Sequence, residues 1–449
     1  MGSFAHLESI DRRHHFHPKT DNRAFRETGG PMMVRAEGCY VFDTTGKRYL
    51  DAVAGLANVN LGYSDRHVKD AIARQLETLP YWHSFTGTSN DASAALTRKL
   101  LDVLPTHLNN LYYIASGSEA IESGVKIAHL FWKRLGKPHK KKLITYDRSY
   151  HGNTVLASAL TGNSIYHDQF HLPLADIIRL RSPYKFAHGR GETDADFTAQ
   201  LIEELRAAIE SHGPDTIAAI VAEPLQASGG GIVAPDGYWP EVAQLCRDYE
   251  VLFIADEVIT GLGRLGHWLG SEAFGLEPDI VALAKGITSG YIPLGAVAFS
   301  DRVCDPLVAS NEYFMHGFSA SGHPVAAAAA TATIEAIEKQ DLLANVISGA
   351  GAVLRDALEA LQSYEVVAEV RGRGLAVALE LEPAVLGKSD PVINAHAAAV
   401  CAEICRRLGV LVRGADNTIL LSPPLVIDHT EALAIASAIE FALKALPNT

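Results

Sequence analysis

Ile217-Ala218-Ala219-Ile220-Val221-Ala222 is the stretch that decides the fold of this chain. All of its residues are apolar, so both faces of a strand formed here must be covered. A strand with one face in water would instead alternate between apolar and polar residues. The stretch therefore predicts a mainly parallel sheet with helices on both sides, which is an α/β architecture.

The same pattern continues on either side of this stretch. Between about residues 110 and 300, short β-type runs alternate with amphipathic helical stretches. This order is typical of an α/β domain. We expect further strands at 111–114, 142–146, 251–255, 280–283 and 296–299, and helices at 119–135, 196–211 and 238–249.

The two ends of the chain have a different organisation. Towards the C-terminus, long helices at about 325–339 and 342–362 precede short strands, one of them at 410–413, and further helices. This order predicts a smaller α+β domain. A hairpin signal with a turn at Thr44-Thr45-Gly46 is expected to pack with that domain. The predicted divisions are an N-terminal segment at 1–60, a large domain at 61–330 and a small domain at 331–449.

The composition is that of an acidic globular protein. Of its 449 residues, 48% are hydrophobic and 20% charged, which argues against disorder. The 39 Lys and Arg stand against 52 Asp and Glu, a formal net charge of −13, so we expect neither nucleic acid nor a membrane as partner. We see no apolar run of about 18 residues and no secretory signal. Five scattered cysteines fit reduced thiols in a cytoplasmic protein.

Three motifs suggest ligands that their surroundings do not support. Gly261-Leu262-Gly263-Arg264-Leu265-Gly266 matches the dinucleotide pattern, but it does not follow its strand directly and no helix signal comes after it. We interpret it as a tightly turned loop, with a nicotinamide dehydrogenase as the alternative. His14-His15-Phe16-His17 and the pair Cys401 and Cys405 resemble metal ligands, but we expect no metal at either.

Three features at predicted strand ends carry chemistry. Ser116-Gly117-Ser118-Glu119 opens a helix, and its backbone N–H groups suit a phosphate, although the same sequence also caps helices without a ligand. Asp256 ends an apolar strand, where its carboxylate needs a metal or a protonated ring nitrogen as partner. Lys285 ends another apolar run, where it becomes a nucleophilic amine if buried, or simply reaches past the strand end. Together they are the groups that pyridoxal phosphate requires.

With these residues the sequence resembles the class III aminotransferases of the fold type I pyridoxal-phosphate family. Within that class it is most similar to the amine:pyruvate, or omega-, transaminases. The resemblance extends from about His14 to Leu446. Its further motifs are Tyr150-His151-Gly152, Ala222-Glu223-Pro224, Ala255-Asp256-Glu257-Val258, Ala284-Lys285-Gly286 and the stretch 316–324.

The resemblance implies a role for each matching residue. Lys285 corresponds to the lysine that forms the Schiff base with pyridoxal 5′-phosphate and moves the substrate proton. Asp256 corresponds to the partner of the pyridine nitrogen, and Val258 and Tyr150 to the residues on the two ring faces. The implied catalytic residues are Lys285, Asp256 and Tyr150, and the remaining cofactor contacts are Ser116, Gly117, Ser118, His151 and Glu223.

The resemblance also implies that two subunits share each active site. Ser319 stands where the family usually has Thr, and it would bind the phosphate of the neighbouring subunit's cofactor. Phe85 corresponds to a pocket aromatic contributed across the same interface, although it would serve equally as interface core. We therefore expect a homodimer. A tetramer formed by two such dimers is the alternative.

Four positions bear on the substrate. Arg413 corresponds to the mobile arginine that binds a substrate carboxylate. Ile259 replaces the Gln usual in 4-aminobutyrate-type members. Ala57 replaces an aromatic residue and should open the pocket, and Ser228 adds a polar group.

We therefore expect a transaminase that moves an amino group from a primary amine or an omega-amino acid to pyruvate by a ping-pong mechanism. The alternatives are a 2-oxoglutarate-dependent aminotransferase or a dialkylglycine decarboxylase of the same class. A pyridoxal-phosphate-binding protein without turnover is a further alternative.

Overall fold

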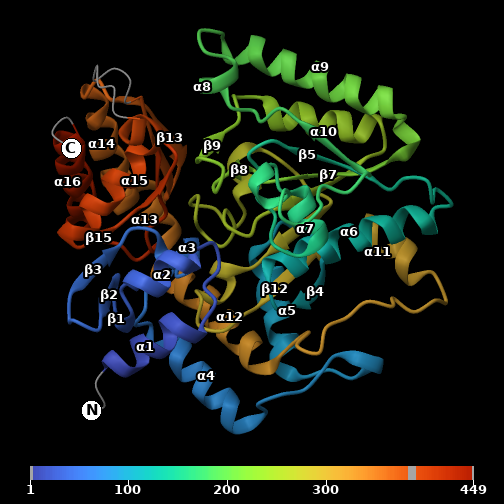
Figure 1. The fold of residues 1–449 in the computed structure, drawn as a ribbon. Helices are drawn as coiled ribbons and strands as arrows, with labels where there is room; N and C mark the ends of the chain where they lie inside the picture. The colour runs from blue at the N-terminus through green and yellow to red at the C-terminus, as the bar shows by residue number, and fades with distance from the viewer. Residues whose placement is uncertain (1–3, 383–390, 447–449) are drawn as a thin grey trace.

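The centre of the molecule is a seven-stranded sheet with the strand order β4-β12-β11-β10-β7-β5-β6 (Figure 1). The computed structural model describes residues 4–382 and 391–446. Strand β12 runs antiparallel to both of its neighbours, and every other adjacent pair is parallel, so the predicted mainly parallel sheet is confirmed. In sheet order the strands are Asn110–Ile114, Gly295–Phe299, Ile280–Leu283, Leu252–Asp256, Ile217–Ala222, Lys142–Tyr146 and Ile177–Leu180.

Both faces of this sheet are covered. On β7, Ile220 faces one apolar layer and Val221 the other, which is why that strand is apolar throughout. Helices α6 (Gly117–Arg134) and α11 (Asp301–Val308) pack on the Val221 side. The layer on the other face includes α5 (Asp91–Val103), α9 (Asp194–His212), α10 (Tyr238–Asp248) and α12 (Pro324–Lys339).

Strand β6 is the member of this sheet that the sequence does not predict. It pairs with β5 at the edge of the sheet, and each of its residues is only partly buried. Arg179 stands among its few apolar residues and interrupts the run that would mark a strand. An edge strand needs less apolar surface than a central one, so its signal in the sequence is weak.

The C-terminal part has its own antiparallel sheet, in the order β13-β14-β17-β16. The helix expected at 342–362 is wrong as one element, because it breaks at Gly349 into α13 and α14. Gly349 has a ψ of −129°, and the Asn345 side chain accepts a hydrogen bond from the Ala350 N–H at 3.0 Å. The elements are α13 (Leu342–Ser348), α14 (Ala350–Glu359), β13 (Val367–Arg373), β14 (Ala376–Leu381), α15 (Pro391–Leu408), β16 (Arg413–Ala415), β17 (Thr418–Leu421) and α16 (His429–Ala445).

A third sheet joins the two ends of the chain, in the order β1-β2-β3-β15. Figure 1 shows its N-terminal strands in blue beside the C-terminal elements in red, and β15 (Val410–Leu411) pairs in parallel with β3 (Arg48–Asp51). The single strand expected at 410–413 is therefore wrong, because the chain passes from this sheet into β16 of the next one.

The predicted boundary at residue 330 falls inside α12, and the division into 1–60, 61–330 and 331–449 stays a prediction. None of the helices in the described ranges is long and apolar enough to cross a lipid bilayer. The helices and strands whose bounds have not yet been given are α1 (Phe4–His14), α2 (Asn22–Thr28), β1 (Met33–Glu37), β2 (Tyr40–Asp43), α3 (Ala54–Ala57), α4 (Arg66–Thr78), α7 (Val155–Leu160), α8 (Lys185–His188), β8 (Leu225–Gln226) and β9 (Ile232–Val233).

Candidate active site

A cavity of about 290 Å³ lies beyond the carboxyl ends of the central strands. This edge is where open α/β sheets place their ligands, because several strand-to-helix connections meet there. Nine residues predicted from the sequence line the cavity, and they come from the connections that follow β4, β5, β7, β10 and β11. They are Ser116, Gly117, Ser118, Tyr150, His151, Glu223, Asp256, Val258 and Lys285.

One end of the cavity is formed by the start of helix α6. The Ser116 side chain caps the helix by accepting a hydrogen bond from the Glu119 N–H at 3.2 Å, so the capping interpretation of this motif is correct. The cap leaves the N–H groups of Gly117 and Ser118 without partners within the helix, where they suit an anion. A Cβ on Gly117 would lie 2.9 Å from Val258 Cγ1, so a larger residue would fill the cradle.

The carboxylate of Asp256 is fixed at the end of β10. Its Oδ2 lies 2.8 Å from Nδ1 of the buried His151, and its Oδ1 accepts a hydrogen bond from the Val258 N–H at 3.1 Å. His151 is itself held, since its backbone N–H donates to Thr161 Oγ1 at 3.0 Å. Asp256 is 4% exposed, so a cationic ring nitrogen placed in the cavity would meet a desolvated, oriented acid.

Glu223 lies beside Asp256 and faces the same cavity. Its two carboxylate oxygens accept hydrogen bonds from the N–H groups of Tyr150 at 2.9 Å and Ala227 at 3.2 Å. Burial, together with the nearby charge of Asp256, raises the pKa of Glu223 to about 8. Glu223 is therefore harder to ionise at neutral pH than an ordinary glutamate.

Lys285 supplies the amine of the site. It lies two residues after the end of β11, has a φ of +47° and is largely buried. Burial lowers its pKa to about 8; Asp256 and Glu223 oppose this shift, while Arg413 and Lys19 add to it. Roughly a tenth of this amine is therefore unprotonated at pH 7, far more than at the ordinary lysine pKa of about 10.4, and this fraction can act as a nucleophile or general base.

Ile259 also lines the cavity, whereas the other predicted residues lie outside the residues that line it. Arg413 is half-buried on β16, close enough for its charge to act on Lys285. Ala57 is buried at the end of α3, and Ser228 is half-buried in the turn between β8 and β9. Phe85 and Ser319 are exposed, and their segments meet where the Tyr81 hydroxyl donates to the Ser319 carbonyl at 2.9 Å.

The structure adds residues that the sequence analysis missed. Asn58 lines the cavity, and within the described part of the chain its buried Oδ1 has no hydrogen-bond partner. Lys19 comes from the distant N-terminus and lies with its Nζ 4.4 Å from the centroid of the Tyr150 ring. Neither residue belongs to a local motif, so no signal in the sequence pointed to it. The other additions are Thr288, Gly290, Ile292, Pro293 and Leu294, which follow Lys285.

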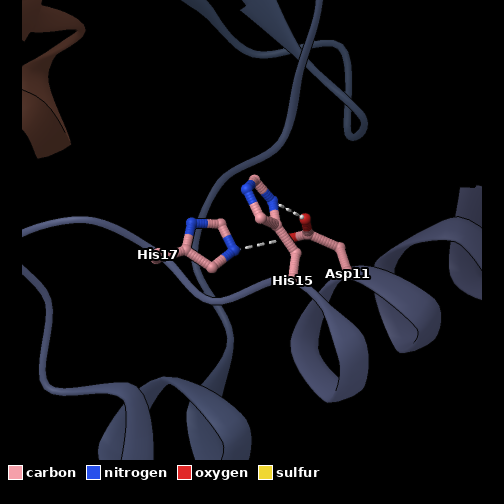
Figure 2. A group of neighbouring side chains, drawn as sticks. All are labelled: Asp11, His15 and His17. Atoms are coloured by element: carbon pink, nitrogen blue, oxygen red, sulfur yellow. Dashed lines mark hydrogen bonds and ion pairs between the residues drawn. The ribbon is translucent and has the colours of Figure 1, made fainter.

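The glycine-rich motif and the histidine-rich motif of the sequence analysis have ordinary structures. Residues 261–266 form turns, with Gly263 and Gly266 at φ values of +96° and +83°, and no helix begins there. In the histidine-rich stretch, Asp11 joins His15 and His17 (Figure 2), with ligand atoms of the three within 4.8 Å of one another. The absence of a metal from this stretch stays a prediction.

The residues around the cavity fit pyridoxal 5′-phosphate. The free N–H groups at the start of α6 suit its phosphate, Asp256 suits its ring nitrogen, and the amine of Lys285 suits its aldehyde. The buried acceptor of Asn58 remains for a bound donor group.

Comparison with known proteins agrees with this geometry. The family model described as aminotransferase class-III matches residues 26–443. A putrescine–pyruvate aminotransferase of Pseudomonas aeruginosa is 36% identical over 444 residues, covering 98% of this chain and 96% of the relative.

Two solved structures share the whole fold. An (S)-enantioselective omega-transaminase from Thermomicrobium roseum has a TM-score of 0.95 at 38% identity, covering 99% of both chains. An omega-transaminase from Pseudomonas jessenii, in complex with PMP, has a TM-score of 0.94 at 34% identity, covering 98% of both chains. The fold type I architecture and the enzyme class expected from the sequence are thus confirmed, and the chain belongs to the class-III aminotransferases.

Proposed function

We propose that this enzyme transfers an amino group from a primary amine or an omega-amino acid to pyruvate, with pyridoxal 5′-phosphate held in the cavity. One observation carries the proposal. A largely buried Lys285 and an oriented Asp256 face the same cavity at the carboxyl end of the sheet. The Pseudomonas aeruginosa relative is named for putrescine and pyruvate, which supports pyruvate as the acceptor.

The chain's own residues hold and activate the cofactor. The start of α6, with Ser116, Gly117 and Ser118, binds the phosphate, and Tyr150 and Val258 enclose the ring. Asp256, oriented by His151, holds a proton on the ring nitrogen, and Glu223 adds a second carboxyl group beside it. When bound, the cofactor supplies an electron-accepting ring that stabilises the charge left by a departing proton.

Lys285 moves the proton that makes the reaction a transamination. Its Nζ would accept the proton from the substrate carbon and then donate it again, which a lysine of ordinary pKa would do poorly. A pKa of about 8 leaves the amine able both to accept and to donate a proton at neutral pH.

Substrate choice depends on the open side of the cavity. Arg413 binds the carboxylate of the keto acid, since a guanidinium offers two parallel donors to a carboxylate. Ala57 and Phe85 shape the region that takes the amine, and Ser228 contributes a polar side chain. Ile259, which lines the cavity, replaces the Gln usual in 4-aminobutyrate-type members and supports pyruvate over 2-oxoglutarate.

We further propose a cytoplasmic homodimer with shared active sites, in which Ser319 of each subunit binds the phosphate of its neighbour. Large apolar side chains stay exposed on the segments that carry Phe85 and Ser319, which favours a covering partner. They are Tyr81, Trp82, Tyr313, Phe314 and Met315. The free cysteines at 39, 246, 304, 401 and 405 fit a reducing compartment.

A single-turnover absorbance experiment tests the reaction. One donor at a time, either an arylalkylamine, a diamine, an omega-amino acid or alanine, is added to the purified holoenzyme without an acceptor. We expect the near-visible absorbance of the bound cofactor to disappear and then to return when pyruvate is added. The Lys285→Ala variant should show neither change, whereas Lys444→Ala, a surface control, should behave like the wild type.

Three results would contradict the proposal. They are recovery with 2-oxoglutarate but not pyruvate, release of carbon dioxide from a dialkylglycine, or no spectral change with any donor. The first two would select the other reactions of this class, and the third would indicate a binding protein without turnover.

A further inference from the structure

The segment between α1 and α2 is held in one conformation by a network of side chains. In Figure 2, the carboxylate of Asp11 joins both histidines, since His15 Nδ1 lies 2.9 Å from Oδ1 and His17 Nε2 lies 3.1 Å from Oδ2. The ring of His17 also packs on Phe25 of α2, with 4.1 Å between the centroids. The Asn22 side chain exchanges two hydrogen bonds with the His17 backbone, each 2.9 Å long. This network fixes the backbone immediately before residue 19.

Lys19 is exposed and extends from this segment to Tyr150, which lines the cavity, and to the neighbouring Tyr166. Its φ of +51° is uncommon for a non-glycine residue. Its Nζ donates a hydrogen bond to the Tyr166 hydroxyl at 3.0 Å and lies 4.4 Å from the ring centroid of Tyr150, which lines the cavity. Across residues 4–382 and 391–446, no carboxylate forms an ion pair with Lys19. The ammonium therefore stands beside the cavity without a counter-ion.

Two cations thus lie near the cavity, although neither of them lines it. The charges of Lys19 and of Arg413 both act on the amine of Lys285, so both lie within electrostatic reach of the reacting position. Arg413 is assigned to the carboxylate of the keto acid. A second cation has no role in binding a simple alkylamine, and it repels the distal ammonium of a diamine.

We propose that Lys19 binds the distal anionic group of the amine donor and so selects omega-amino acids over diamines. A carboxylate placed there receives a charge-assisted hydrogen bond from the ammonium in exchange for the hydrogen bond to Tyr166. This inference rests on the proposed transaminase function and assigns its donor class.

Charge-neutral and charge-reversed variants test the role of Lys19. Donor specificity is measured with pyruvate as the acceptor and with 4-aminobutyrate, 1-butylamine or 1,4-diaminobutane as the donor. For Lys19→Met we expect kcat/KM with 4-aminobutyrate to fall roughly fivefold, through KM more than kcat, while 1-butylamine changes by less than about twofold. Lys19→Glu should enlarge this loss and increase kcat/KM with the diamine. Added salt should shrink the differences.

A binding measurement gives a readout that does not need turnover. Butanoate retains the carboxylate of 4-aminobutyrate without its amine, and its affinity for the holoenzyme is measured by calorimetry. We expect Lys19→Met to weaken butanoate binding roughly fivefold. Lys141→Met is the matched control. Lys141 is an exposed lysine just before β5, at the amino end of the strand, whereas the cavity lies at the carboxyl ends.

The outcomes separate this inference from the function on which it rests. Equal losses with 4-aminobutyrate and 1-butylamine in Lys19→Met would show a merely structural role and overturn the inference. Unchanged donor ratios and unchanged butanoate affinity would also overturn it, while the transaminase function would stand. Failure of every donor with the wild-type enzyme would overturn both.

Discussion

Asp256 is the residue on which the chemistry of the cofactor ring depends. It is held by the ring of His151 and by the Val258 N–H. We expect Asp256→Asn to lower kcat by about 100-fold or more, because a neutral amide does not hold a proton on the ring nitrogen. The shape of the side chain is kept, so the melting temperature should change little. Steady-state kinetics and thermal unfolding measure the two effects, and near-normal kcat would contradict the assigned role.

The pKa of Lys285 sets a pH dependence. As the pH rises through about 8 the amine loses its proton, so the rate at which the apoenzyme captures pyridoxal phosphate should rise up to that pH and then level off. Stopped-flow absorbance measures this rate. Arg413→Met removes a positive neighbour that lowers the pKa, so its midpoint should move upward. A wild-type midpoint near the ordinary lysine value of about 10.4 would contradict this account.

At the scale of single residues, the sequence predicts the site residues that lie at strand ends. It misses the site residues that come from distant segments of the chain. An apolar run precedes each of Gly117, Asp256 and Lys285, so the local sequence predicts that these residues lie at strand ends. Lys19 and Asn58 reach the site through tertiary packing alone. A single sequence without a local motif gives no information about such contacts.

Two glycines of helix α6 allow a test of how closely the phosphate cradle is packed. A Cβ at Gly117 would lie 2.9 Å from Val258 Cγ1, so Gly117→Ala should cost about 1–3 kcal/mol of unfolding free energy and weaken phosphate binding. Gly124→Ala is the control in the same helix, because its Cβ would lie 3.4 Å from Ile280 Cγ2. There the gain in helix propensity, about 1 kcal/mol, offsets any crowding. Urea unfolding and phosphate titration of both variants check this, and equal effects would refute it.

Elements are predicted well where burial is extreme and poorly where the chain changes direction. The strand expected at 216–222 is β7, with the bounds Ile217–Ala222, because its two apolar faces must both be covered. The break at Gly349 was missed because the apolar pattern continues through it, and the departure depends on one glycine and the Asn345 side chain.

The whole molecule is expected to work as a pair of subunits, and complementation tests this. Lys285→Ala should be inactive, and Ser319→Asp should be nearly so, because its charge repels the phosphate in the partner's site. A heterodimer of the two variants, purified with two different tags, has one site with both native residues. We therefore expect about half of the wild-type activity. An inactive heterodimer, or a fully active Ser319→Asp homodimer, would contradict sharing of the site.

The pairing of β3 with β15 has a consequence for synthesis. One edge of β3 stays unpaired until Val410 and Leu411 have left the ribosome, because no earlier segment of the chain takes that place. A nascent chain stopped before residue 410 would contain Asp256 and Lys285 but would lack Arg413 and expose an open strand edge. Such a fragment would be prone to aggregate, because an unpaired strand edge is a template for pairing with another chain.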